Sequence, residues 1–295
     1  MKHTDILAIA SNEIAAMKWR YIPVVNITKP STIEYARQLA KVVSKLSPLL
    51  GNMIEFSMVD MLNSYDWQGL GIWKRQDPGF PDAIFSSNSI LPNPGIEVKT
   101  WFPFATEITA RFKDSVSHFA DDQINVAMIA WLPEYVIWGA PVIVDTWVDS
   151  ASSVATARDV HYHRPPDYLV FEPEDTSTRT ANLQQTNTNG YKFQGSASDF
   201  TRAKHIVDSW GVDGERYSTS PEYQHKLQGL LGSFSYRLDT NFAKMDRIRH
   251  SSLEEFKARV LETEYKGRKI REWSQILSRQ DATLDRELLR LIQNG

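Results

Sequence analysis

A run of seven apolar residues limits the fold of this chain more than any other feature. Residues 126–132 read Val-Ala-Met-Ile-Ala-Trp-Leu and lie between Asn125 and Pro133. A strand with one solvated face alternates apolar and polar residues, so an almost unbroken apolar run predicts a strand that is buried on both faces. We therefore expect an α/β fold in which a mixed central β-sheet is flanked by helices.

Apolar residues at helical spacing predict the helices that cover this sheet. Such spacing is present over residues 4–19, 31–46 and 50–63, and a long helical pattern follows residue 220. Two further helices are expected over residues 150–160 and 198–210. We expect residues 1–220 to form the core domain and residues 221–295 to form a helical C-terminal region.

Composition excludes several classes of protein. The chain has 295 residues, of which 42% are hydrophobic and 23% charged, as in ordinary globular proteins. It contains no cysteine, which excludes disulfides, thiol catalysis and zinc-thiolate sites. No apolar segment has the length of a membrane span or the pattern of a secretory signal, so we expect a cytoplasmic protein with no membrane partner. The net charge of -3 argues against indiscriminate coating of nucleic acid, but it allows an enzyme whose basic groups line a cleft.

The second informative stretch is Gly-Ile-Glu-Val-Lys-Thr at residues 95–100. Its alternation predicts a half-buried strand with Glu97 and Lys99 on one face. Asp82 follows a proline and precedes the apolar residues 83–85, so it would join these two side chains if the two segments pair. The two carboxylates could bind Mg²⁺, and the ammonium group could act on a water molecule held by the ion. The alternative is that Glu97 and Lys99 form the solvated face of an amphipathic strand.

Pro-Asp, a spacer and Glu-x-Lys together resemble the signature of the PD-(D/E)xK nuclease superfamily, and residues 95–100 are similar to the corresponding strand of its MutH-like group. The resemblance implies a type II restriction endonuclease, a homodimer that cleaves double-stranded DNA at specific sequences with Mg²⁺. It implies that Asp82 and Glu97 ligate the metal, that Lys99 positions the attacking water and that Glu55 assists.

Two of these assignments have alternatives. The spacer between Asp82 and Glu97 is longer than in the MutH-like enzymes, and Asp77 is a rival for the first metal ligand. Glu55 lies beside the apolar face of the helix predicted over residues 50–63, where a glutamate could instead be a solvated surface residue.

Residues 174–192 predict a loop that reads DNA bases. Long amides, hydroxyls and basic groups are frequent in it, and amide side chains can bond bidentately to adenine as arginine can to guanine. The candidate DNA-binding residues are Arg179, Asn182, Gln184, Gln185, Asn187 and Lys192. A flexible polar loop would have the same composition. The rival functions are a MutH-like mismatch-repair nicking endonuclease and a non-catalytic DNA-binding protein on the same fold.

Overall fold

The described part of the chain falls into two compact units. The computed structural model describes residues 1–23, 25–76, 79–112, 119, 121–162, 191–193, 195–212, 220–234, 236–238 and 244–294. Unit 1 comprises Met1–Thr109, Phe119–Ser152 and Ser251–Gly295, and unit 2 comprises Ala110–His118 and Ser153–His250.

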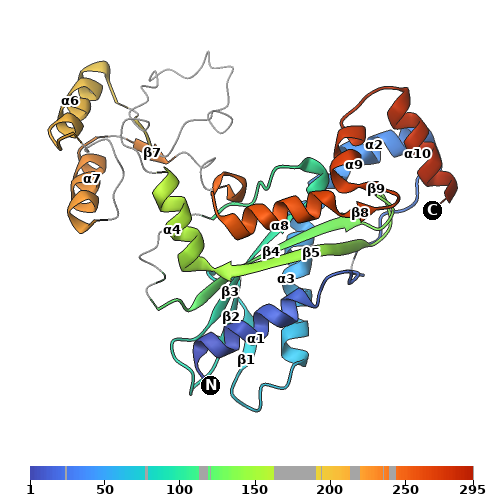
Figure 1. The fold of residues 1–295 in the computed structure, drawn as a ribbon, viewed down its shortest axis with the longest axis horizontal. Helices are drawn as coiled ribbons and strands as arrows, with labels where there is room; N and C mark the ends of the chain where they lie inside the picture. The colour runs from blue at the N-terminus through green and yellow to red at the C-terminus, as the bar shows by residue number, and fades with distance from the viewer. Residues whose placement is uncertain are drawn as a thin grey trace. The chain divides into compact units, whose positions relative to one another are not determined.

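Unit 1 contains a five-stranded mixed sheet with the order β1-β2-β3-β4-β5 (Figure 1). Its strands are β1 Ile72–Arg75, β2 Ala83–Ser86, β3 Gly95–Trp101, β4 Ile124–Pro133 and β5 Pro141–Ser150. β3 and β4 are parallel, and the other neighbouring pairs are antiparallel. Every residue of β4 except Asn125 is buried. The strand predicted from residues 126–132 is therefore confirmed, and it lies inside the sheet between β3 and β5.

Helices lie on both faces of this sheet, as predicted. Among the described helices, α1 His3–Ala15, α3 Ser47–Ser64 and α8 Ser251–Glu262 pack on it. Gly51 of α3 lies beside Thr100 of β3, since a Cβ added to this glycine would be 3.5 Å from the threonine Oγ1. The next residue of the strand, Trp101, contacts Phe256 of α8, with ring centroids 6.0 Å apart. Because successive side chains of a strand point to opposite faces, α3 and α8 cover opposite faces of β3.

The remaining elements of unit 1 lie around the sheet. They are α2 Ile33–Val42, the 3₁₀ turns η1 Val43–Leu46 and η2 Pro103–Ala105, the hairpin of β8 Glu264–Tyr265 and β9 Arg268–Lys269, α9 Ile270–Leu277 and α10 Ala282–Asn294. The helix expected over residues 31–46 is shorter than predicted, because it becomes a 3₁₀ turn after Val42. Its cap is Thr32, whose side chain accepts a hydrogen bond from the backbone N–H of Tyr35. α10 packs on α2, and Arg37 Nε donates to Asp285 Oδ1 at 2.6 Å.

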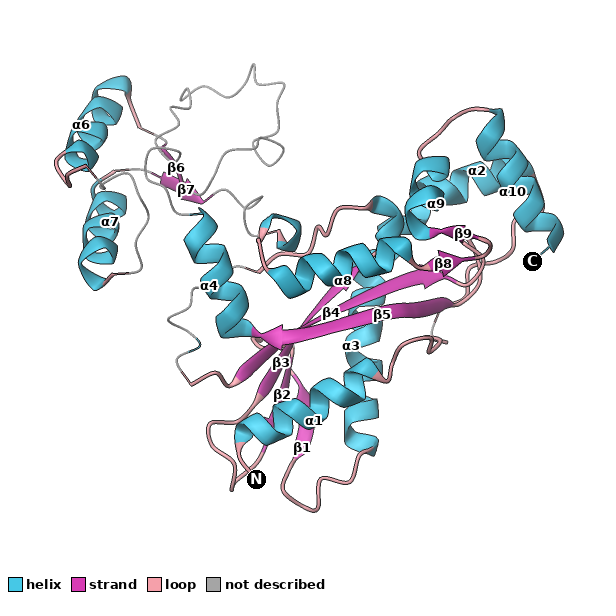
Figure 2. Cartoon of the chain, viewed as in Figure 1, coloured by secondary structure: helices cyan, strands magenta, loops and turns pink. Residues whose placement is uncertain are grey.

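Unit 2 is mainly helical in its described part (Figure 2). It contains most of α4 Ala151–Tyr162, the pair β6 Tyr191–Phe193 and β7 Tyr236–Leu238, α6 Ala197–Asp208, α7 Pro221–Ser233 and η6 Met245–Arg247. The helices predicted over 150–160 and 198–210 are confirmed as α4 and α6. Ala203 and Val207 of α6 form a small apolar core with Leu230 of α7. The antiparallel register of β6 and β7 places Lys192 opposite Arg237.

The compact units do not follow the expected boundary near residue 220. α7 belongs to unit 2, whereas α8, α9 and α10 belong to unit 1. Hydrogen bonds join the returning segment to the sheet: for example, Trp147 Nε1 donates to Ser252 Oγ at 2.9 Å, and the Tyr265 hydroxyl donates to the Pro133 carbonyl at 2.9 Å. Within the described ranges, no helix combines the length and the hydropathy that crossing a membrane requires.

Candidate functional site

Asp82 and Glu97 face each other where β2 begins beside β3. The register pairs Ala83 with Ile96, and the preceding position of β2 brings Asp82 to Glu97. The backbone N–H of Asp82 donates to Glu97 Oε2 at 3.2 Å, and the backbone N–H of Val98 donates to Asp82 Oδ2 at 2.7 Å. Each carboxylate thus accepts a hydrogen bond from the opposite strand, which fixes both side chains. The predicted pairing of these two segments is confirmed.

Gly95 allows the segment that carries Asp82 to lie close against β3. A Cβ at residue 95 would be 2.3 Å from Cγ of Pro81 and 3.2 Å from the carbonyl oxygen of Ala83. Real Cβ contacts are not this short, so any larger residue would push the proline and the adjoining aspartate away. Gly95 therefore leaves the space that Pro81 occupies, and this contact holds Asp82 close to β3.

Lys99 binds Glu97 directly, through a hydrogen bond from its ammonium group to Oε1. The two side chains share one face of β3, as the alternation predicted. The prediction of a half-buried strand is wrong, however, because Glu97 is only 8% exposed and the Lys99 side chain 17%. Helices cover both faces of β3, so this acid and base are partly removed from water and are not a solvated strand face.

Burial raises the pKa of Glu97 to about 7, from an ordinary value of 4.5. Removal from water disfavours the carboxylate, and the nearby charge of Asp82 raises the pKa further. The ammonium group of Lys99 and the N–H of Asp82 act in the opposite direction. The site therefore holds one carboxylate more than its single ammonium neutralises, and a second cation would stabilise the ionised form of Glu97.

Glu55 lies on α3, and an arginine side chain holds its carboxylate. Arg75 of β1 donates from Nε to Glu55 Oε2 at 3.1 Å and from Nη2 to Asn52 Oδ1 at 3.1 Å. The Arg75 guanidinium also lies 4.5 Å from the ring centroid of Phe56. The Glu55 side chain is 16% exposed, so the alternative of a solvated surface glutamate does not hold.

The charges of neighbouring side chains affect the pKa of Glu55. Burial raises the pKa of Glu55, and repulsion from Asp82 raises it further, while Arg75 and Lys99 lower it. Sequence reasoning missed both Arg75 and Asn52. Asn52 lies three residues before Glu55 on the same helix, a spacing that places them on one face. Arg75 ends the short segment 72–75, Ile-Trp-Lys-Arg, and no local pattern connects it to α3.

The chemistry of these side chains fits Mg²⁺ better than a softer metal. In the described ranges, no three His, Asp or Glu side chains come together as a group that could hold a metal ion. Mg²⁺ commonly takes one or two carboxylates and keeps water in its other positions. Asp82 Oδ1 accepts no hydrogen bond from a described residue, and Glu97 carries the raised pKa that a cation would lower. Asp82 and Glu97 are thus a carboxylate pair suited to one such ion.

Other candidate residues lie outside the described part of the chain. These are Asp77, the rival for the first metal ligand, and the loop residues Arg179, Asn182, Gln184, Gln185 and Asn187. Lys192 is described as the middle residue of β6.

Comparisons with known proteins supply no relative. No protein-family model, no curated protein and no solved structure matches the chain. The case for a function therefore rests on the chain's own residues, above all those that converge at the start of β2.

Proposed function

We propose that this protein is a Mg²⁺-dependent endonuclease that hydrolyses phosphodiester bonds in double-stranded DNA at specific sequences, as type II restriction endonucleases do. One observation carries the proposal. The Asp82 N–H donates to the Glu97 carboxylate, the Val98 N–H donates to the Asp82 carboxylate, and Lys99 binds the same glutamate. Asp82, Glu97 and Lys99 are three of the four residues that the resemblance to the PD-(D/E)xK nucleases assigns to catalysis, and Glu55 is the fourth.

The electrostatics favour a catalytic role over a structural ion pair. A structural pair needs one carboxylate for one ammonium, and a second buried carboxylate beside it costs stability. Here Asp82 raises the pKa of Glu97, so the site contains a repulsion that a bound cation would remove. Perturbed carboxylates of this kind gather at functional sites.

Each residue then has a role that follows from its position. Asp82 and Glu97 would hold Mg²⁺, which when bound would stabilise charge on the phosphate and lower the pKa of a bound water. Lys99 donates to the glutamate that would hold the ion, so its ammonium lies where it can orient the attacking water and stabilise developing charge. Glu55 would assist through its charge, and Arg75 positions it.

Residues 174–192 would read the DNA sequence. Their amides and arginine offer the paired donors and acceptors that distinguish bases in the major groove. At the end of this stretch, the register of β6 and β7 brings Lys192 and Arg237 to one position in unit 2. Basic residues beside a base-reading segment would hold phosphates and fix its register on the duplex. A homodimer on a palindromic site would cut both strands.

The decisive experiment is digestion of plasmid DNA of known sequence by the purified full chain with Mg²⁺ or with EDTA. We expect linear products whose mapped ends share one sequence, and no products with EDTA. Lys99→Ala should abolish cleavage while specific binding stays measurable, because both carboxylates remain. Lys74→Ala is the matched control, since it removes an exposed lysine from β1 in the same sheet.

The products also discriminate the rival functions. Nicked circles without linear DNA would indicate a nicking endonuclease, and specific binding without any cut would indicate a non-catalytic protein. Cleavage by Lys99→Ala within a few-fold of the wild type would refute the assignment of this site.

A further inference from the structure

Phe56 of α3 presents a half-exposed aromatic ring. The residue is 50% exposed, and the guanidinium carbon of Arg75 lies over its ring, 4.5 Å from the centroid. A cation is attracted to the face of an aromatic ring, so Arg75 occupies one face and the exposed surface lies away from it. Single exposed apolar side chains are common on proteins, so exposure alone gives Phe56 no role. The way in which Arg75 is held, and its position in the sheet, distinguish this ring.

Two hydrogen bonds to α3 hold the Arg75 guanidinium in place. Its Nε donates to Glu55 Oε2 and its Nη2 donates to Asn52 Oδ1, each at 3.1 Å. Asn52 and Phe56 are four residues apart on α3 and lie on the same side of the helix. The helix that carries the ring therefore also fixes the arginine that covers one of its faces. Because the pair is ordered in advance, a flat molecule that stacks on the ring would cost the protein little conformational entropy.

The sheet brings this pair next to the acidic residues of the site. Arg75 is the last residue of β1, and the N–H of Gln76, which follows it, donates to the Asp82 carbonyl at 2.8 Å. Neighbouring strands lie about 4.8 Å apart, so the backbone at Arg75 is close to one strand spacing from the backbone at Asp82. Glu55 links the two groups, because it binds Arg75, and burial and then the charge of Asp82 raise its pKa. Phe56 and Arg75 therefore lie at the edge of the candidate active site.

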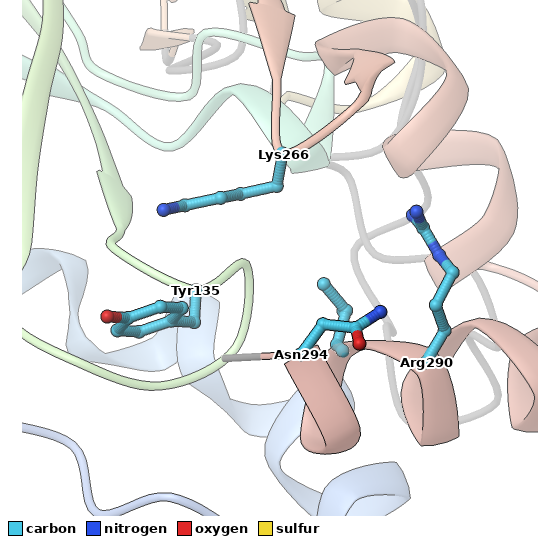
Figure 3. A pocket seen from close by; sticks show the side chains of 5 residues that line it. Tyr135, Lys266, Arg290 and Asn294 are labelled. Carbon is cyan, nitrogen blue, oxygen red and sulfur yellow. The ribbon is translucent and has the colours of Figure 1, made fainter.

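A comparable contact elsewhere in unit 1 leaves no face of its ring open. It lies in a pocket of about 160 Å³ at the end of α10, which is lined by Tyr135, Lys266, Arg290, Leu291 and Asn294. The Lys266 ammonium group is 4.6 Å from the Tyr135 ring centroid and points over this ring, away from Arg290 and Asn294 (Figure 3). Trp138 stacks on the same ring at an interplanar angle of 11°, so both faces of Tyr135 have protein partners. Phe56 differs, because no second ring stacks on it in the described part of the chain.

We propose that the exposed face of Phe56 stacks on a nucleobase of the substrate, beside the phosphate that is cleaved. This contact rests on the nuclease function proposed above and adds a part of the substrate to it. Every nucleobase has an aromatic face, and the stacking of bases on aromatic side chains tolerates any sequence. A neutral base can also approach the acidic pair without the repulsion that a phosphate meets there.

The contact has a consequence for the form of the DNA. Bases in an intact duplex are stacked on both faces, so a base that reaches Phe56 must be unpaired or turned out of the helix. Turning a base out costs least where it is mismatched or already single-stranded. We therefore expect the contact to be strongest with an unpaired base, and single-stranded DNA is the simplest probe of it.

The test measures binding of two single-stranded oligonucleotides to the full chain in EDTA, where nothing is cleaved. One carries thymine at every position, and the other has the same number of phosphates but only abasic sites, so they differ in bases and not in charge. The wild type should bind the first more tightly. Phe56→Ala should weaken binding of the first about tenfold and leave binding of the second unchanged, because one stacking contact is lost. Phe56→Trp should bind the first at least as tightly as the wild type, because indole has a larger face.

Two further variants show whether the effect belongs to this ring and its support. Leu49→Ala truncates another apolar side chain of α3, which is 47% exposed, and should bind both oligonucleotides like the wild type. Arg75→Lys keeps the charge but loses the planar group that bonds to Glu55 and Asn52 together. It should weaken binding of the thymine oligonucleotide several-fold and leave binding of the abasic one unchanged.

Wild-type binding of both oligonucleotides by Phe56→Ala would overturn the proposal, as would a wild type that does not distinguish them. A changed sedimentation coefficient of Phe56→Ala without a change in base-dependent binding would also overturn it, and would make the ring a contact between two copies of the chain.

Plasmid cleavage with Mg²⁺ separates these results from the nuclease function. Cleavage by a wild type that does not distinguish the two oligonucleotides would overturn the base contact alone. Base-dependent binding that requires Phe56, without any cleavage, would support the base contact and overturn the nuclease function.

Discussion

Replacing Glu97 by glutamine should stabilise the protein at alkaline pH while abolishing cleavage. The pKa of Glu97 in the folded protein is about 7, against 4.5 without its surroundings. A raised pKa in an acid means that the folded state holds the proton more tightly than the unfolded state. The contribution of Glu97 to stability is therefore complete below about pH 4.5 and is lost as the pH rises through about 7.

The size of the effect follows from the same values. A pKa difference between 4.5 and about 7 corresponds to about 3 kcal/mol of stability at high pH, since each unit is worth about 1.4 kcal/mol. Glutamine keeps an oxygen that can accept from the Asp82 N–H, but it leaves Lys99 without its ionic partner. We therefore expect Glu97→Gln to gain about 1–2 kcal/mol at about pH 8.5 and almost nothing at about pH 5.

Urea unfolding across this pH range is the assay, with plasmid cleavage measured on the same preparations. Glu97→Gln should show a flatter dependence of stability on pH than the wild type, and no cleavage. The reasoning is refuted if the variant is less stable than the wild type at about pH 8.5, or if the two pH profiles are parallel. Asp60→Asn is a suitable control, because Asp60 is an exposed acid on α3.

Three other predictions concern different parts of the molecule. Gly95→Ala should destabilise the protein by about 1–3 kcal/mol through the clash with Pro81, whereas Gly51→Ala, where a Cβ meets only an ordinary 3.5 Å contact, should be neutral or stabilising in urea unfolding. Arg75→Ala should cost about 1–3 kcal/mol near neutral pH and raise the pKa of Glu55 further, with partial recovery in Arg75→Lys; an unchanged pKa by NMR titration would show that the ion pair is not what holds this carboxylate. Alanine at Arg179, Asn182 or Gln185 should weaken binding to the cognate duplex by about 1–3 kcal/mol each and leave random duplexes little affected; equal losses on both duplexes would place base reading elsewhere.

The parts of the site that are local in sequence could be predicted. Alternation along residues 95–100 was enough to put Glu97 and Lys99 on one face of β3, because a strand repeats every two residues. Asp82 could be added to the site because it directly precedes residues 83–85. Once this segment pairs with β3, the residue before it lies beside Glu97. The apolar run of β4 was equally direct evidence for a covered sheet.

Contacts between distant segments could not be predicted in this way. Charged residues at alternate positions suggest a solvated face, yet Glu97 is only 8% exposed in the folded protein, and at the end of this face Trp101 contacts Phe256 of α8. The partner of Glu55 is likewise set by packing, since Arg75 reaches α3 from the first strand of the sheet.

The return of residues 251–294 to the sheet affects how the protein is made. Phe256 packs on Trp101, and Tyr265 reaches the end of β4, so the core of unit 1 closes only after this segment has been synthesised. Roughly a hundred residues separate β5 from it along the chain. At about 5–20 residues per second, the apolar face that α8 will cover stays open for about 5–20 s on the ribosome. We expect the nascent sheet to be open to chaperones during that interval, because they bind exposed apolar surface. Because Ser252 Oγ donates to Asp149 Oδ2 at 2.9 Å, the chain leaves and rejoins unit 1 at neighbouring points, and the intervening segment can change in length without altering the order of the strands.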